Sequence, residues 1–350
     1  MRDFRYSFFV TILCLGLAAI WGFKTSGTIA GVWPAISIVA ILGVMEVSLS
    51  FDNAVVNASV LKEMDAKWRQ IFLTIGILVA VFGMRLLFPI LTVAVATNQG
   101  MFDVAQMALN TPEEYSKHLH DSHTAIAAFG GTFLLLVFLS FLFDEGKDVH
   151  WLGKIEETLA KLGKIDSIGI IIALLTLISL QNYLPITPEE KSTVLLSGIS
   201  GLVLYVIVDS LGSFFEIEEE GEAIAATAKR SGIMGFVYLE ILDASFSFDG
   251  VIGAFAITRD VVIIMLGLAI GAMFVRSLTV YLVNKGTLDE YVFLEHGAHY
   301  AIGVLALIMF YSIHEEVPEL FTGLVGVAFI VAAVISSLIY KSKHQEQWEN

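Results

Sequence analysis

The sequence has one cysteine, Cys14, in 350 residues. A single cysteine excludes an internal disulfide framework and a zinc site built from cysteines. Charged residues are also scarce, at 16% of the chain, compared with about 25% in soluble domains. The phosphate-binding pattern G-x-x-x-x-G-K-[ST] is absent, which argues against direct use of ATP. The formal net charge of −15 is not the signature of a nucleic-acid partner.

Apolar residues dominate instead, at 56% of the chain with a mean hydropathy of +0.78. Runs of about 20 such residues, long enough to cross a bilayer as a helix, recur along the sequence. We therefore predict an all-α, polytopic helical membrane protein embedded in a lipid bilayer. No small-residue cleavage site follows the first run, so we keep it as a span and not a signal peptide. The ten predicted spans are 6–23, 30–61, 71–97, 123–144, 166–184 (short, with a re-entrant segment as the alternative), 192–214, 231–257, 260–284, 296–313 and 318–340.

The distribution of basic residues predicts the orientation of these spans. Placing the N-terminus in the cytoplasm puts 14 of the 20 lysine and arginine residues on the cytoplasmic side. The outer segments then hold only Lys24, Lys117, Lys191 and Arg259. This asymmetry follows the positive-inside rule. It favours a multi-pass protein of the inner (cytoplasmic) membrane with both termini in the cytoplasm.

One short pattern occurs twice inside apolar runs. It reads EVSLSFDN at residues 46–53 and DASFSFDG at residues 243–250. The two predicted spans cross the membrane in opposite directions, and inverted repeats commonly build transport sites near the bilayer midplane. We therefore predict repeats at 30–144 and 231–340. The remaining segments are an N-terminal helix at 1–29, a connecting segment with two extra spans at 145–230 and a cytoplasmic tail at 341–350.

The acids of the two motifs are predicted to meet. If the motif helices cross at the midplane, Glu46 lies level with Asp249, and Asp52 lies level with Asp243. Glu46 and Asp52 are six residues apart and would point about 240° apart on a straight helix. We therefore expect a helix that is broken at the motif, which Gly250 would permit in the second copy.

Acids inside membrane spans are costly and mark ion pathways. Carboxylate and hydroxyl oxygens suit Mg, Ca or Mn, and four motif acids against two arginines leave a charge that a divalent cation would neutralise. The predicted metal ligands are Glu46, Asp52, Asn53, Glu240, Asp243 and Asp249. The predicted supporting residues are Ser48, Ser50, Ser245, Ser247, Arg85, Arg276 and Asp209.

At these residues the chain resembles the TerC family of integral membrane proteins. The matching positions are Glu46, Ser50, Asp52 and Asn53 in the first half, and Glu240, Asp243, Phe248, Asp249, residues 254–258 and Arg276 in the second half. The family is similar to the larger lysine-exporter superfamily, and several of its members are implicated in manganese export. The resemblance implies an inner-membrane Mn²⁺ efflux protein with the paired acids as ligands.

The leading functional prediction is thus a secondary transporter that exports a divalent metal cation, with Mn²⁺ favoured and proton exchange as a coupling option. The alternatives are a calcium/cation exchanger, an intramembrane diaspartyl protease and a membrane scaffold. We expect the metal ion as substrate, no organic cofactor, no nucleic-acid partner and no enzymatic activity. The oligomeric state, the role of the inserted spans at 166–214 and the role of the His-rich outer loop at 113–123 do not follow from the sequence.

Overall fold

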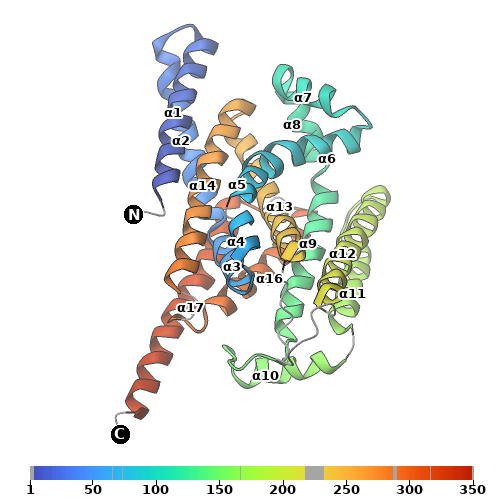
Figure 1. The fold of residues 1–350 in the computed structure, drawn as a ribbon. Helices are drawn as coiled ribbons and strands as arrows, with labels where there is room; N and C mark the ends of the chain where they lie inside the picture. Colours follow the sequence, from blue (N-terminus) through green and yellow to red (C-terminus); the bar gives the residue numbers. More distant parts are fainter. Residues whose placement is uncertain are drawn as a thin grey trace. The chain divides into compact units, whose positions relative to one another are not determined.

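The computed structural model describes residues 4–64, 66–72, 74–165, 167–216, 232–286, 290–315 and 317–348. Helices make up almost all of this part of the chain, and no β-strand occurs in it (Figure 1). The predicted all-α fold class is therefore confirmed.

The main helices follow the apolar runs. In the first half they are α1 (Arg5–Ser26), α2 (Val32–Leu49), α3 (Phe51–Glu63), α4 (Ala66–Phe72), α5 (Ile75–Leu78), the π-helix η2 (Val79–Leu87), α6 (Phe88–Thr97), α7 (Met101–Asn110), α8 (Pro112–Asp121) and α9 (His123–Leu142). In the second half they are α10 (Lys154–Ala160), α11 (Ile168–Tyr183), α12 (Pro188–Glu216), α13 (Gly232–Ile257), α14 (Val261–Lys285), α16 (Leu294–Ser312) and α17 (Glu319–Trp348). Short 3₁₀ turns lie at Ile29–Gly31 and Lys161–Lys164.

Several of these helices can cross a bilayer, because their backbone groups are paired internally and their side chains are apolar. Within the described ranges, six are long and apolar enough: Arg5–Ser26, Ile29–Leu49, His123–Leu142, Pro188–Ser210, Val261–Lys285 and Phe321–Lys343. The pair Lys154–Lys164 and Ile168–Tyr183 adds a seventh if the two helices, bent by 99°, form one broken span. The chain is thus a polytopic membrane protein, while the predicted count of ten spans is not confirmed.

The chain forms two compact units that alternate along the sequence. The first contains residues 1–54, 69–123 and 240–281, and the second contains residues 55–68, 124–239 and 282–350. Each unit draws on both halves of the chain. The proposed segments 1–29, 30–144, 145–230, 231–340 and 341–350 stay predictions.

In the first unit, α2 and α14 pack closely because glycine removes a side chain from the contact. A methyl group at Gly267 would lie 2.5 Å from Leu42 Cβ. Close approach through small residues is the usual way that helices associate in a membrane. The Ser7 hydroxyl of α1 also donates a 2.7 Å hydrogen bond to the Met273 carbonyl of α14. These contacts bring α14 against the first motif.

The second unit uses the same device between α9 and α16. Gly131 lies against the Phe310 ring, where an added methyl group would come within 3.0 Å of it. On the other helix, Gly303 lies against the Phe138 ring, where an added methyl group would be 2.7 Å from the ring. Both glycines therefore set the spacing of the two most buried helices of this unit.

The helix break expected at the motif occurs in the first copy. Helix α2 ends at Leu49, Ser50 has φ −105° and ψ 19°, and α3 begins at Phe51. The second copy is continuous, because α13 runs without interruption through Gly250. The glycine therefore does not break the helix as predicted; it makes room for a neighbouring carboxylate.

Candidate functional site

The first half of the site is a buried ion pair. Glu46 lies on the last turns of α2, Arg85 lies in η2, and the Arg85 guanidinium donates to Glu46 Oε1. Both residues are almost fully buried, with 1% and 4% exposure. Ser50, at the helix break, also donates to Glu46 Oε1 over 3.2 Å. The Glu46 carboxylate is therefore enclosed within the first unit, where the Arg85 guanidinium and the Ser50 hydroxyl donate hydrogen bonds to it.

Asp243 of α13 joins this pair from a distant part of the chain. Its Oδ1 accepts a 2.8 Å hydrogen bond from the Asn53 amide of α3, and its Oδ2 lies 3.8 Å from Arg85 Nη1. The guanidinium thus lies between two carboxylates from different helices. The structure brings Glu46, Asn53 and Asp243, three of the predicted ligands, to one place.

Glu240 lies one turn before Asp243 and faces a second arginine. It is 7% exposed, and neither carboxylate oxygen has a hydrogen-bond partner in the described part of the chain. The guanidinium of Arg276, on α14, lies over the Phe72 ring with its carbon 4.1 Å from the ring centre. Gly76 lies beside the same carboxylate, since a methyl group there would be 3.0 Å from Glu240 Oε1. This second group holds opposite charges close together without a direct ion pair.

Two further glycines form a slot for Glu46. A methyl group at Gly250 would lie 2.6 Å from Glu46 Oε2, and one at Gly271 would overlap Glu46 Cβ and Cγ. Only a residue without Cβ fits at either position while the glutamate keeps its place. The acidic motifs do not point to Gly271, Gly76 or Phe72 as site residues. The spacing of Gly267 and Gly271, G-x-x-x-G in an apolar run, was the available signal.

The predicted serines divide into two groups. Ser50, Ser245 and Ser247 are buried, and Ser245 donates to the Ile241 carbonyl of its own helix. Ser48 is exposed and donates to Val44 O, away from the acids. The structure therefore does not bring Ser48 to the site.

The other predicted residues have different positions. Asp209 lies on α12, in the second unit, and is exposed. Asp52 and Asp249 lie on α3 and α13, but their side chains are outside the part that the structure describes. Among the described side chains, no group of three or more His, Cys, Asp or Glu residues is arranged to hold a metal ion. The predicted metal ligand set stays a prediction.

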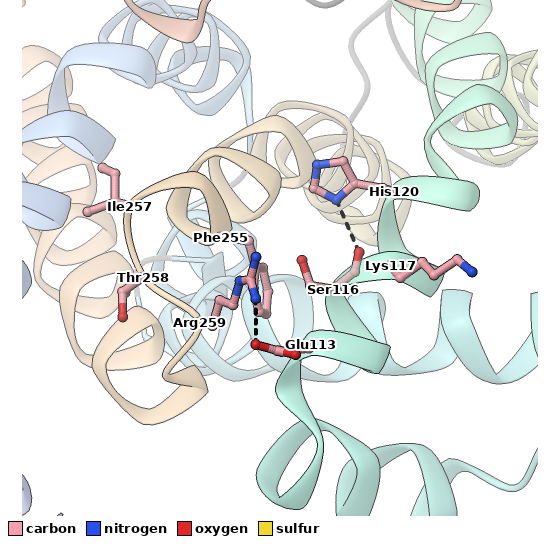
Figure 2. Close-up of a pocket in the computed structure, with 8 residues that line it drawn as sticks. All are labelled: Glu113, Ser116, Lys117, His120, Phe255, Ile257, Thr258 and Arg259. Carbon is pink, nitrogen blue, oxygen red and sulfur yellow. Dashed lines mark hydrogen bonds and ion pairs between the residues drawn. The ribbon is translucent and has the colours of Figure 1, made fainter.

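The outer loop at 113–123 is largely helical. Together with the end of α13 it lines an open cavity of 720 Å³ (Figure 2), formed by Glu113, Ser116, Lys117, His120, Phe255, Ile257, Thr258 and Arg259. Arg259 donates a 2.6 Å hydrogen bond to Glu113, and both side chains are well exposed. The centre of the Tyr115 ring lies 5.7 Å from that of the Phe255 ring, and burial raises the pKa of the Tyr115 hydroxyl. Helix α8 therefore packs against the C-terminal end of α13.

Comparison with known proteins corrects the family assignment. A family model described as "Protein of unknown function (DUF475)" matches residues 51–344. The uncharacterized membrane protein YceF of Bacillus subtilis (strain 168) is 29% identical over 140 residues, which cover 38% of this chain and 53% of that protein. The chain thus spans about half the length of this curated relative. No solved structure gives a significant match.

The TerC assignment was wrong, because the matching model describes a different family. Two phrases of eight residues, together with Glu240, residues 254–258 and Arg276, carried that assignment. Any membrane helix that buries acids beside serine and glycine can contain such a phrase, so the phrases indicate a buried polar site and do not identify a family. The chain belongs to the DUF475 family.

Proposed function

We propose that the protein is a secondary transporter for a divalent metal cation and that the acids of α2, α3 and α13 form its transit site. One observation carries the proposal: Glu46, Asn53 and Asp243 converge from three helices inside one membrane unit. The carboxylate oxygens of Glu46 and Asp243 that meet there are hard ligands, which suit Mg²⁺, Ca²⁺ and Mn²⁺. We test Mn²⁺ first, because its unpaired electrons report binding directly.

The energetic cost of the cluster supports a use for it. A charged side chain near the centre of a membrane helix costs about 2.5–3.5 kcal/mol on insertion scales. Glu46, Glu240 and Asp243 against Arg85 and Arg276 leave one net negative charge when all five are ionised. Replacing the acids and arginines with apolar residues would remove this cost, so the chain retains it for a reason beyond packing.

The proposal includes an orientation. The split of basic residues supports a protein of the inner membrane with both termini in the cytoplasm. Outward transport of the cation is part of the proposal, and the metal content of cells lacking the protein tests it. We expect no catalytic activity. The alternative of a diaspartyl protease requires Asp52 and Asp249 as its catalytic pair. Asp52→Asn and Asp249→Asn test it: a protease predicts that both variants lose cleavage of a membrane protein while the metal content of the cells stays unchanged.

A membrane scaffold is the second candidate, and one specific observation favours it. Glu46 and Arg85 form a buried ion pair in direct contact. A purely structural role for Glu46 requires such a partner, because an unpaired buried charge is strongly destabilising. A scaffold predicts that neutral variants lose stability but change no metal flux.

The experiment that separates these functions is Mn²⁺ flux into liposomes containing the purified protein, together with the metal content of cells with and without it. Glu46→Gln and Asp243→Asn are expected to abolish the flux. Glu157→Gln, which changes an exposed acid of α10, is the matched control and should retain it. Export predicts that cells lacking the protein accumulate Mn²⁺. Unchanged flux in both site variants, with normal folding, would refute transport through this cluster.

A further inference from the structure

The guanidinium of Arg85 stands where a cation held by Glu46 and Asp243 would have to lie. It donates to Glu46 of α2, and its Nη1 atom is 3.8 Å from Asp243 Oδ2 of α13. Asp243 Oδ2 has no hydrogen-bond partner within the described structure. A metal ion cannot engage both carboxylates while a like charge lies between them.

The backbone that carries Arg85 has an unusual geometry. Residues Val79–Leu87 form a π-helix, and Arg85 Nη1 donates a 2.6 Å hydrogen bond to the Ala80 carbonyl, five residues earlier. π-Helical turns are rare and frequently occur at functional sites. Conversion of one such turn to α geometry changes the register by one residue, which rotates the following side chains by about 100°. The segment therefore offers a local way to move Arg85 without moving α2 or α13.

Arg276 shows the contrasting state of an arginine in the same unit. It is 9% exposed, yet its guanidinium rests on the Phe72 ring, and no carboxylate of the described chain lies within ion-pair distance of it. Its Nε and Nη2 atoms likewise find no hydrogen-bond partner there. A buried arginine in this unit is thus held against an aromatic ring, with the Glu240 carboxylate nearby but not in a direct ion pair. The two arginines differ in whether they occupy a carboxylate pair.

We infer that Arg85 is a built-in counter-cation: it occupies the position of the transported cation on Glu46 and Asp243 in the unloaded protein, and η2 withdraws it before a divalent cation binds. The inference rests on the proposed function and adds to it a residue that sets cation affinity. In the absence of cation, Arg85 lies between the two acids and offsets one of their two negative charges. On loading, the cation takes over that role and the guanidinium leaves.

The test is the binding of Mn²⁺ to the purified protein in lipid nanodiscs, measured by electron paramagnetic resonance. Arg85→Gln removes the competitor, so its affinity for Mn²⁺ should rise by about tenfold or more. Lys161→Gln is the control, because it removes one positive charge from an exposed pair with Glu157 in the second unit; its affinity should change by less than about threefold. An equal rise in both variants, or no rise in Arg85→Gln, would overturn the inference.

Arg85→Lys guards against misfolding of the glutamine variant. Lysine keeps the charge but lacks the planar fork that reaches two acceptors, so this variant should bind Mn²⁺ with an affinity between wild type and Arg85→Gln. A lysine variant that binds more weakly than wild type would contradict a competitor role. Amide hydrogen exchange over residues 79–87 should also change when Mn²⁺ saturates the protein, and unchanged exchange would overturn the withdrawal step.

The outcomes for the function and for the inference differ. If the wild type carries Mn²⁺ and Arg85→Gln binds it no more tightly, only the inference fails. If neither the wild type nor Arg85→Gln binds Mn²⁺, Ca²⁺ or Mg²⁺, the proposed function fails and the inference fails with it. Binding by Arg85→Gln alone would support Arg85 as the competing cation.

Discussion

The glycine slot around Glu46 gives a direct test of the site geometry. In Gly271→Ala, the new methyl group would overlap the Glu46 stem at Cβ and Cγ, close to the backbone of α2. The glutamate cannot avoid this overlap by rotating its carboxylate, so α2 or α14 must move. Overpacking of this kind costs about 1–3 kcal/mol, from which the better helix propensity of alanine recovers about 1 kcal/mol. If the shift also breaks the Glu46–Arg85 pair, the cost rises to about 3–5 kcal/mol.

The assay is the free energy of unfolding of the purified protein in detergent, followed by Mn²⁺ flux in liposomes. Gly16→Ala is the control, because Gly16 also lies in a helix and nothing is within 4 Å of the added methyl group. Gly16→Ala should leave stability unchanged or raise it, whereas Gly271→Ala should lower stability and flux. Equal stability of the two variants would refute the slot.

Two further predictions use matched residues. Ser50→Ala should weaken Mn²⁺ flux and lower the free energy of unfolding by about 0.5–1.5 kcal/mol, because it removes the hydrogen bond to Glu46. Ser48→Ala should change neither quantity. Similar effects in the two variants would contradict a role for Ser50 in the site. In the second unit, Lys147→Met leaves the fully buried Glu156 carboxylate without its 2.8 Å partner. Thermal denaturation should therefore show that the free energy of unfolding falls by about 3–5 kcal/mol, with the Mn²⁺ affinity unchanged. A fall of less than about 1 kcal/mol would show that this ion pair is not needed for stability.

Much of the fold could be predicted from the sequence because its strongest signals are local. Apolar runs define helices, and the run at 261–285 appears as one continuous helix. Counting residues along two oppositely directed helices predicts Glu46 level with Asp249, and in the structure Glu46 lies against Gly250, the next residue. The same count predicts Asp52 level with Asp243, and the amide of Asn53, the neighbour of Asp52, donates a hydrogen bond to Asp243. Register along two antiparallel helices follows from residue counts alone.

Other features could not be predicted, because they depend on how the backbone adapts to packing. Nothing in VAVFGMRLL, residues 79–87, distinguishes a π-helix from an α-helix. The break in the first motif falls at Ser50, although Gly250 in the second motif looked more permissive. Among the described side chains, Arg276 contacts an aromatic ring, Phe72, and makes no direct ion pair with an acid, which charge balance would not reveal. The family assignment failed for a similar reason, since short phrases describe a local environment and not ancestry.

The alternation of the two units along the chain has a consequence for biogenesis. The Glu46–Arg85 contact joins residues 39 positions apart, whereas the Asn53–Asp243 contact joins residues 190 positions apart. During synthesis, Glu46 therefore meets its arginine early, and Asn53 waits until nearly two hundred more residues have left the ribosome. Until then the Asn53 amide lacks its Asp243 partner, and the insertion machinery or lipid headgroups must provide a polar environment for it. Nascent chains arrested before residue 240 should therefore remain bound to membrane chaperones, and those extended beyond residue 281 should be released.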